Sequence, residues 1–276
     1  MKDGHGITPF SWAVRTGHKS IAKLLLNTGR VDIDSKDRVG ETPLLLAART
    51  NHKSIIELLL NTGKVDVDLK DSYNQTPLSL AVWRGHEDII KLLLNTGKAD
   101  INSKDSDGQT PLSLAVQTGR KSIVKLLLDT GKVDVDSKDN FDKTPFLWAA
   151  SAGHEDIVKL LLDTGKVNIE LEDSIGQTLL SRAVLAGHEG IVKLLLDTGK
   201  VDIELKDISG QALLSRAVLA EHEGVVKLLL DTGKVDIELK NSSNQTPVSY
   251  AAYTGHKGII KLLLETGKVD VYSKDK

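Results

Sequence analysis

The most conspicuous absence in the sequence is cysteine. None of its 276 residues is a cysteine. Disulfide bonds and thiolate metal sites are therefore excluded, which fits a protein of a reducing compartment. The sequence also lacks an apolar run of about 18 residues, the length that spans a membrane, and its N-terminal segment MKDGHGITPFSW has no apolar signal core. We expect a soluble, intracellular protein, in the cytoplasm or the nucleus, with no membrane partner.

Neither sign of charge predominates. The chain has 36 Lys and Arg against 38 Asp and Glu, a formal net charge of -2, with both signs interleaved throughout. No basic stripe is available for a phosphate backbone, which argues against a nucleic-acid partner. Glycine-rich phosphate loops and the G-x-S-x-G and H-E-x-x-H motifs are also missing. We therefore expect no enzyme activity, no cofactor and no small-molecule substrate.

What the sequence does contain is a repeat of 34 residues without insertion or deletion. Thr-Pro pairs mark it at residues 8, 42, 76, 110, 144 and 246, and Thr178-Leu179 and Ala212-Leu213 fill the two remaining places. A fixed period of this length predicts a solenoid, in which each repeat buries its apolar face against its neighbours. We predict a single array over residues 1–276. Its eight repeats would span 1–34, 35–68, 69–102, 103–136, 137–170, 171–204, 205–238 and 239–272.

One repeat, residues 103–136, predicts the same elements for all eight. Thr110 is suited to cap a helix that starts at Pro111 and ends near residue 118, before Gly119. A second helix is predicted from about residue 121 to 129, with Ile123, Val124, Leu127 and Leu128 buried, and Gly131 would end it. The arm after that glycine, Val-Asp-Val-Asp at 133–136, alternates apolar and acidic residues and predicts a short strand.

The pattern of residues 105–131 resembles the ankyrin repeat. It runs D-x-x-G-x-T-P-L-x-x-A-x-x-x-G-H-x-x-I-V-K-L-L-L-x-x-G, with Arg120 in the place of the histidine. The usual repeat has about 33 residues, and the family's T-P-L-H histidine is replaced here by serine or leucine, as at Ser79 and Leu45. The resemblance implies an all-α solenoid of helix-turn-helix repeats with short β-hairpin fingers, and a concave groove that grips proteins. The 34-residue step further resembles ankyrin arrays of filamentous fungi, often attached to nucleotide-binding signalling proteins.

The groove is expected where the repeats differ, because a solenoid must repeat its buried positions and is free to vary those that face a partner. Aromatic and arginine side chains at such positions are typical of binding hot spots. The alternative is scattered exposed apolar residues, which are normal on any protein. The predicted groove residues are Val39, Tyr73, Trp83, Arg84, Phe141, Ile175, Leu185, Ile208, Leu219 and Tyr253. Trp12 and Trp148, which stand at a position usually held by leucine, are predicted to lie in the core.

Seven histidines occupy one position of the repeat, from His18 to His256. Zinc sits about 2 Å from its ligands, whereas neighbouring helices pack about 8–10 Å apart, so these side chains cannot share an ion. We expect them to hydrogen-bond the backbone of the loop between helices. The Asp-x-Asp pairs of the arms lack the glycine and glutamate of a calcium loop, and we interpret them as a solvated edge.

Repeats six and seven, 171–204 and 205–238, differ at only six positions. Both place an arginine, Arg182 or Arg216, on the inner side of the first helix, where it must find a partner or reach solvent. Repeat seven also has Ala212 at the capping position and Glu221 at a glycine position. We therefore expect repeat seven to be the least stable.

The leading functional hypothesis is a non-catalytic scaffold that binds a protein through the concave groove. The alternative is a sensor or regulatory segment of a larger nucleotide-binding signalling protein, which packs on domains of its own chain. Repeat eight bears on this, because it keeps apolar residues such as Ile260 and Leu264 where a terminal repeat should be polar. The chain is expected either to continue or to associate end to end.

Overall fold

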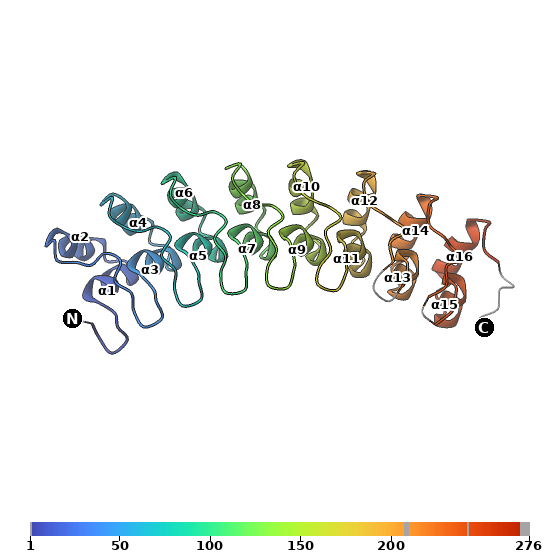
Figure 1. Ribbon diagram of the computed structural model, residues 1–276, viewed down its shortest axis with the longest axis horizontal. Helices are drawn as coiled ribbons and strands as arrows, with labels where there is room; N and C mark the ends of the chain where they lie inside the picture. Colours follow the sequence, from blue (N-terminus) through green and yellow to red (C-terminus); the bar gives the residue numbers. More distant parts are fainter. Residues whose placement is uncertain (1, 207–209, 242, 271–276) are drawn as a thin grey trace. The chain divides into compact units, whose positions relative to one another are not determined.

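The computed structural model describes residues 2–206, 210–241 and 243–270, and these form sixteen α-helices arranged in pairs (Figure 1). The first helices of the pairs are α1 (Pro9–Arg15), α3 (Pro43–Arg49), α5 (Pro77–Arg84), α7 (Pro111–Gln117), α9 (Pro145–Ala152), α11 (Leu179–Ala186), α13 (Leu213–Leu219) and α15 (Pro247–Thr254). The second helices are α2 (Lys19–Asn27), α4 (Lys53–Leu60), α6 (Glu87–Asn95), α8 (Lys121–Leu128), α10 (Glu155–Asp163), α12 (Glu189–Asp197), α14 (Glu223–Asp231) and α16 (Lys257–Glu265). The predicted helical solenoid is confirmed.

The chain divides into two compact units, Met1–Asn140 and Phe141–Lys276. In the first unit α1, α3, α5 and α7 pack side by side in one layer, and α2, α4 and α6 pack in a second (Figure 1). In the second unit α9, α11, α13 and α15 form one layer, and α10, α12, α14 and α16 the other. Each unit is a stack of helix pairs. That the eight repeats form one continuous array stays a prediction.

The first helix of a repeat starts where its threonine caps it. The side-chain oxygen of Thr110 accepts a hydrogen bond from the backbone N–H of Ser113 at 3.2 Å, and proline follows at the first helical position. Ser79 donates to the carbonyl of Thr76 at 3.0 Å, so the serine that replaces the family's histidine bonds within its own helix start. Ala212 makes no such side-chain bond. Repeat seven therefore lacks a cap worth about 1 kcal/mol.

The second helix contributes one apolar stripe to the core between the two layers. Ile123, Val124 and Leu127 are buried as predicted, whereas Leu128 is only half-buried. The helix ends when the hydroxyl of Thr130 donates to the carbonyl of Leu127 at 2.6 Å. The same ending, with threonine followed by glycine, recurs in the other repeats.

The prediction that the acidic arms form strands is wrong. Among the described residues there is no strand, and the one isolated β-bridge joins Lys206 to Ala212. In the arm of repeat four, Asp134 accepts a hydrogen bond from the N–H of Asp136 at 3.2 Å. An aspartate that bonds its own backbone two residues on forms a turn and competes with a sheet ladder. The alternating Val and Asp residues of the arms thus form turns and not paired strands.

The fingers, the turns that precede each first helix, are held by the aspartate that opens them. Asp105 accepts from the N–H groups of Asp107 at 3.0 Å and Gln109 at 2.8 Å. In the first unit each finger is linked to the preceding one by a single backbone hydrogen bond, such as that from Ser106 N–H to the carbonyl of Tyr73 at 3.0 Å. The fingers are therefore stacked turns. A single hydrogen bond between neighbours does not cover the side chains at the finger tips.

Neighbouring arms of the first unit are joined by acidic side chains. Asp68 accepts from the N–H of Asp100 at 2.9 Å, and Asn102 accepts from the N–H of Asp134 at 2.9 Å in the next repeat. Burial raises the pKa of Asp68 above its usual range, and nearby aspartates add to the effect. The asparagine performs the same contact without a charge that must lose its hydration.

Asp68→Asn is therefore expected to stabilise the protein at neutral pH, by about 0.5 kcal/mol. A carboxyl group whose pKa is higher in the folded protein than the unfolded value of about 3.9 stabilises the fold only when it is protonated. This stabilisation is fully present below the unfolded pKa and is lost as the pH rises through the folded-state pKa. The gain from the substitution should thus be present at pH 7 and absent near pH 3, as measured by urea unfolding. The matched variant Asn102→Asp should show the opposite sign. Equal or lower stability of Asp68→Asn at pH 7 would contradict the argument.

Candidate functional site

The predicted groove residues of the first unit all lie on its surface. Val39 and Tyr73 stand at finger tips with 47% and 64% of their surface exposed, and Trp83 near the end of α5 is 43% exposed. Arg84, the last residue of α5, is also exposed. Trp83 and Arg84 are exposed because α5 buries its preceding residues, Leu80 to Val82, and the chain turns at Gly85 directly afterwards.

The second unit shows a weaker version of the same pattern. Phe141, Ile175 and Tyr253 are exposed, by 59%, 46% and 82%. Leu185 and Leu219 are only half-buried, so they offer less surface than expected. The remaining predicted residue, Ile208, lies outside the described residues. Whether these residues bind anything stays a prediction.

Trp12 and Trp148 are not in the core, contrary to the prediction. Trp12 is 40% exposed, and Trp148 is half-buried with the ammonium of Lys143 at 4.1 Å from its ring centroid. The ring N–H of Trp12 donates to Asp3 at 2.8 Å. The position therefore lies beneath the finger and contacts the aspartate that opens it.

Arg182 occupies the same position of its repeat as Trp12 and Trp148, and its partner, like that of Trp12, is the aspartate that opens the finger. Its side chain donates through Nε to the carboxylate of Asp173 at 2.9 Å, with a second bond from Nη2. Asp173 is the opening aspartate of its own finger, and it also accepts from the N–H groups of Ile175 and Gln177. These bonds outweigh burial and lower the pKa of Asp173. Arg182 is thus part of the finger's support.

A hollow of about 450 Å³ lies beneath the first two fingers of the first unit. It is lined by His5, Ile7, Trp12, Arg15, Asp37, Arg38, Val39, Glu41 and Arg49. The guanidinium of Arg15 lies over the ring of Trp12 at 5.2 Å, and Arg49 donates to Glu41 at 2.9 Å. The sequence analysis missed this hollow because it placed Trp12 in the core. The polar residues at equivalent positions, such as Arg182, were the signal that the position is not apolar on all sides.

Several of the repeated histidines contact the backbone of the preceding repeat, as predicted. His52 lies 3.2 Å from the carbonyl of Arg15 in the preceding repeat, and His222 lies 3.0 Å from that of Leu185. Burial lowers the pKa of His86 in the same role, which favours the neutral ring. The described part of the chain holds no cluster of three or more His, Cys, Asp or Glu suited to a metal ion.

Glu221 disturbs this arrangement between repeats seven and eight. It adopts a left-handed conformation, with φ of 63°, at a position held by glycine in six repeats. Its carboxylate lies 2.9 Å from Nε2 of His256. Despite this short distance, Nε2 of His256 has no hydrogen-bond partner. The other histidines of this row with a described hydrogen bond use the preceding repeat's backbone instead.

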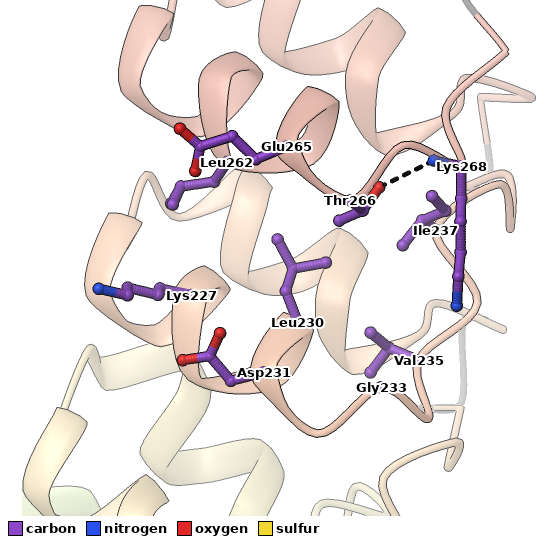
Figure 2. Close-up of a pocket in the computed structure, with 10 residues that line it drawn as sticks. All are labelled: Lys227, Leu230, Asp231, Gly233, Val235, Ile237, Leu262, Glu265, Thr266 and Lys268. Carbon is purple, nitrogen blue, oxygen red and sulfur yellow. Dashed lines mark hydrogen bonds between the residues drawn. The ribbon is translucent and has the colours of Figure 1, made fainter.

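Another hollow, of about 310 Å³, lies between the second helices α14 and α16 and their arms (Figure 2). Figure 2 shows Leu230 at its centre with Lys227 and Asp231 at one side and Lys268 at the other. Both signs of charge line it, and its side chains recur at equivalent positions in repeats four to six. The hollow therefore reflects the spacing between repeats and carries no feature peculiar to one place in the chain.

Comparison with known proteins agrees with this geometry. No helix of residues 2–206, 210–241 and 243–270 is long and apolar enough to cross a membrane. A search of curated proteins found no match. The family model described as ankyrin repeats in three copies matches five overlapping stretches, residues 1–71, 63–139, 97–173, 131–207 and 180–275. Since these matches cover nearly the whole sequence, the chain belongs to the ankyrin repeat family.

Proposed function

We propose that the chain is a non-catalytic scaffold that binds a protein partner through its finger tips and the adjoining ends of its first helices. Ankyrin repeats are generally modules of protein–protein interaction and typically non-catalytic. The observation that carries the proposal is the exposure of aromatic side chains at finger tips, 64% for Tyr73 and 59% for Phe141. A few residues supply most of the binding energy at protein interfaces, and tryptophan and tyrosine are enriched among them.

The exposed aromatic residues stand at positions that folding leaves free. Trp83 is replaced by Gln117 and Ser151 at the equivalent positions of the next two repeats, so no packing requirement demands an aromatic ring. The position two residues before Trp83, by contrast, is a buried alanine in all eight repeats, from Ala13 to Ala251. The alternative of a sensor segment in a larger signalling protein gains no observation from the fold or the family, and it stays a hypothesis, as do the intracellular location and the end-to-end association.

Affinity capture from cell extract with quantitative mass spectrometry tests the proposal. Trp83→Ala combined with Phe141→Ala should reduce the recovery of a specific partner about tenfold or more, because truncated hot spots cost about 2 kcal/mol. Leu24→Ala is the matched control, since Leu24 on α2 is 69% exposed and lies on the other helix layer. Recovery that is equal for the double variant and the wild type would contradict the proposal.

A further inference from the structure

The hollow beneath the first two fingers carries more positive than negative charge. Its lining includes three arginines, Arg15, Arg38 and Arg49, against two acids, Asp37 and Glu41. All of these residues belong to the first unit. A volume of about 450 Å³ falls within the range of about 300–1,000 Å³ that is typical of ligand sites.

Both acids of the hollow are already engaged by the protein. Asp37 accepts from the N–H groups of Val39 at 3.0 Å and of Glu41 at 2.9 Å, so it holds the finger turn. Glu41 is 7% exposed and pairs with Arg49. Burial raises the pKa of Glu41, although the neighbouring Arg49 opposes the shift. Glu41 also attracts Arg15, but its ion pair is with Arg49, and neither carboxylate forms an ion pair with Arg15 or Arg38.

Arg15 and Arg38 are exposed, and neither has an ion-pair partner among the described residues. Arg15 is held in place by its stacking on Trp12. The stem of Arg38 lies against Gly6, where an added Cβ would be 3.3 Å from its Cγ. Arg15 and Arg38 thus both line the hollow without an ion-pair partner in the described part of the chain.

A third donor in the hollow also lacks an acceptor. The Nε of Arg49 is buried and has no hydrogen-bond partner, although its Nη2 is bonded to Glu41. A buried donor left without an acceptor costs about 1–3 kcal/mol. Because this N–H is closed to solvent, a ligand oxygen would have to displace the guanidinium of Arg49 to reach it and remove that cost.

We propose that this hollow binds the carboxylate side chains of an acidic, extended peptide segment, with an apolar neighbour of that segment against Trp12 and Val39. The inference rests on the proposed function, because it assigns the chemistry of one part of the partner. Carboxylates match the planar donor fork of arginine. In the second unit Ser151 and Leu185 stand at the position of Arg15 and Arg49, so the preference for acid belongs to repeats one and two.

Fluorescence anisotropy with a labelled peptide in which glutamate and leucine take turns at every second position, separated by serine, tests the inference on the full chain. Side chains two residues apart lie on the same side of an extended peptide, so both residue types can face the hollow. We expect saturable binding that weakens as salt is raised, because exposed charges are screened. Arg15→Gln with Arg38→Gln should weaken it about tenfold or more, which corresponds to about 1.4 kcal/mol. Trp12→Leu, which introduces the residue found at the equivalent position in three repeats, should weaken it without loss of folding.

Arg30→Gln is the matched control, because it removes the charge of an exposed arginine that does not line the hollow. The same peptide with lysine in place of every glutamate should not bind. The inference is overturned if the arginine double variant binds the acidic peptide as tightly as Arg30→Gln does, or if an oligothymidylate binds equally well through the same arginines. If Trp83→Ala with Phe141→Ala abolishes partner capture while the acidic peptide does not bind, the proposed function stands and this inference fails.

Discussion

Phe146→Ala is expected to lower the free energy of unfolding by about 3–5 kcal/mol. Among the residues that the structure describes, Phe146 is the largest fully buried side chain. It lies on α9, which packs against α10 and α11 in the second unit. Removal of its ring leaves a cavity that fixed helices on both sides cannot fill. Urea unfolding followed by far-ultraviolet circular dichroism measures the effect.

Phe146→Leu is the matched control for this cavity. Five other repeats carry leucine at the equivalent position, for example Leu112 and Leu180, and all five are buried. The backbone of a repeat therefore accommodates leucine, and the expected cost is below about 1.5 kcal/mol. Similar losses for the alanine and leucine variants would show that the packing of the ring is not what stabilises this region.

Gly187→Ala is expected to cost about 2–3 kcal/mol. Gly187 has φ of 71°, where a side chain costs about 1–2 kcal/mol. A Cβ at this position would also lie 2.7 Å from Cε1 of His222 in the next repeat, which adds a steric cost. The loss should therefore be partly relieved in the double variant Gly187→Ala with His222→Ala, as measured in a double-mutant cycle of urea unfolding. Equal and additive losses would contradict the contact between the two positions.

Glu221→Gly applies the same reasoning in the opposite direction. The glutamate has the left-handed conformation that Gly187 has in the preceding repeat, so glycine should remove strain and stabilise by about 1 kcal/mol. It should also allow His256 to reach the carbonyl of Leu219, as the other histidines do. Hydrogen exchange can locate the gain, since the amides of residues 205–238 should be those whose protection rises. Unchanged protection there would argue against repeat seven as the least stable part.

The helices could be predicted because their signals are local. Thr110 and Pro111 favour a helix start wherever they occur, and Gly131 ends one at low cost, so a single repeat was enough to place all the pairs. The arms could not be predicted by alternation, because Asp134 has two uses for its side chain. In a strand it would face solvent, whereas here it bonds the backbone of Asp136 and makes a turn.

The candidate site was only partly accessible from the sequence. Variation between repeats identified Tyr73 and Trp83, which are exposed. It failed for Trp12, because a position that is buried as Leu46 and Leu80 in later repeats is open in the first, beneath its finger. The burial of one position changes along the chain with the neighbouring finger and with the size of the side chain. Periodicity treats such positions as equal.

The contact between the glycine of one repeat and the histidine of the next has a consequence for the evolution of the chain. His222 depends on Gly187 of the repeat before it, and His52 depends in the same way on Gly17. Each repeat contributes its histidine to the contact with the preceding repeat and its glycine to the contact with the following repeat. A gain or loss of any 34 consecutive residues, wherever the break falls, therefore leaves every such pair complete, so the length of the array can change by recombination without a new interface having to arise.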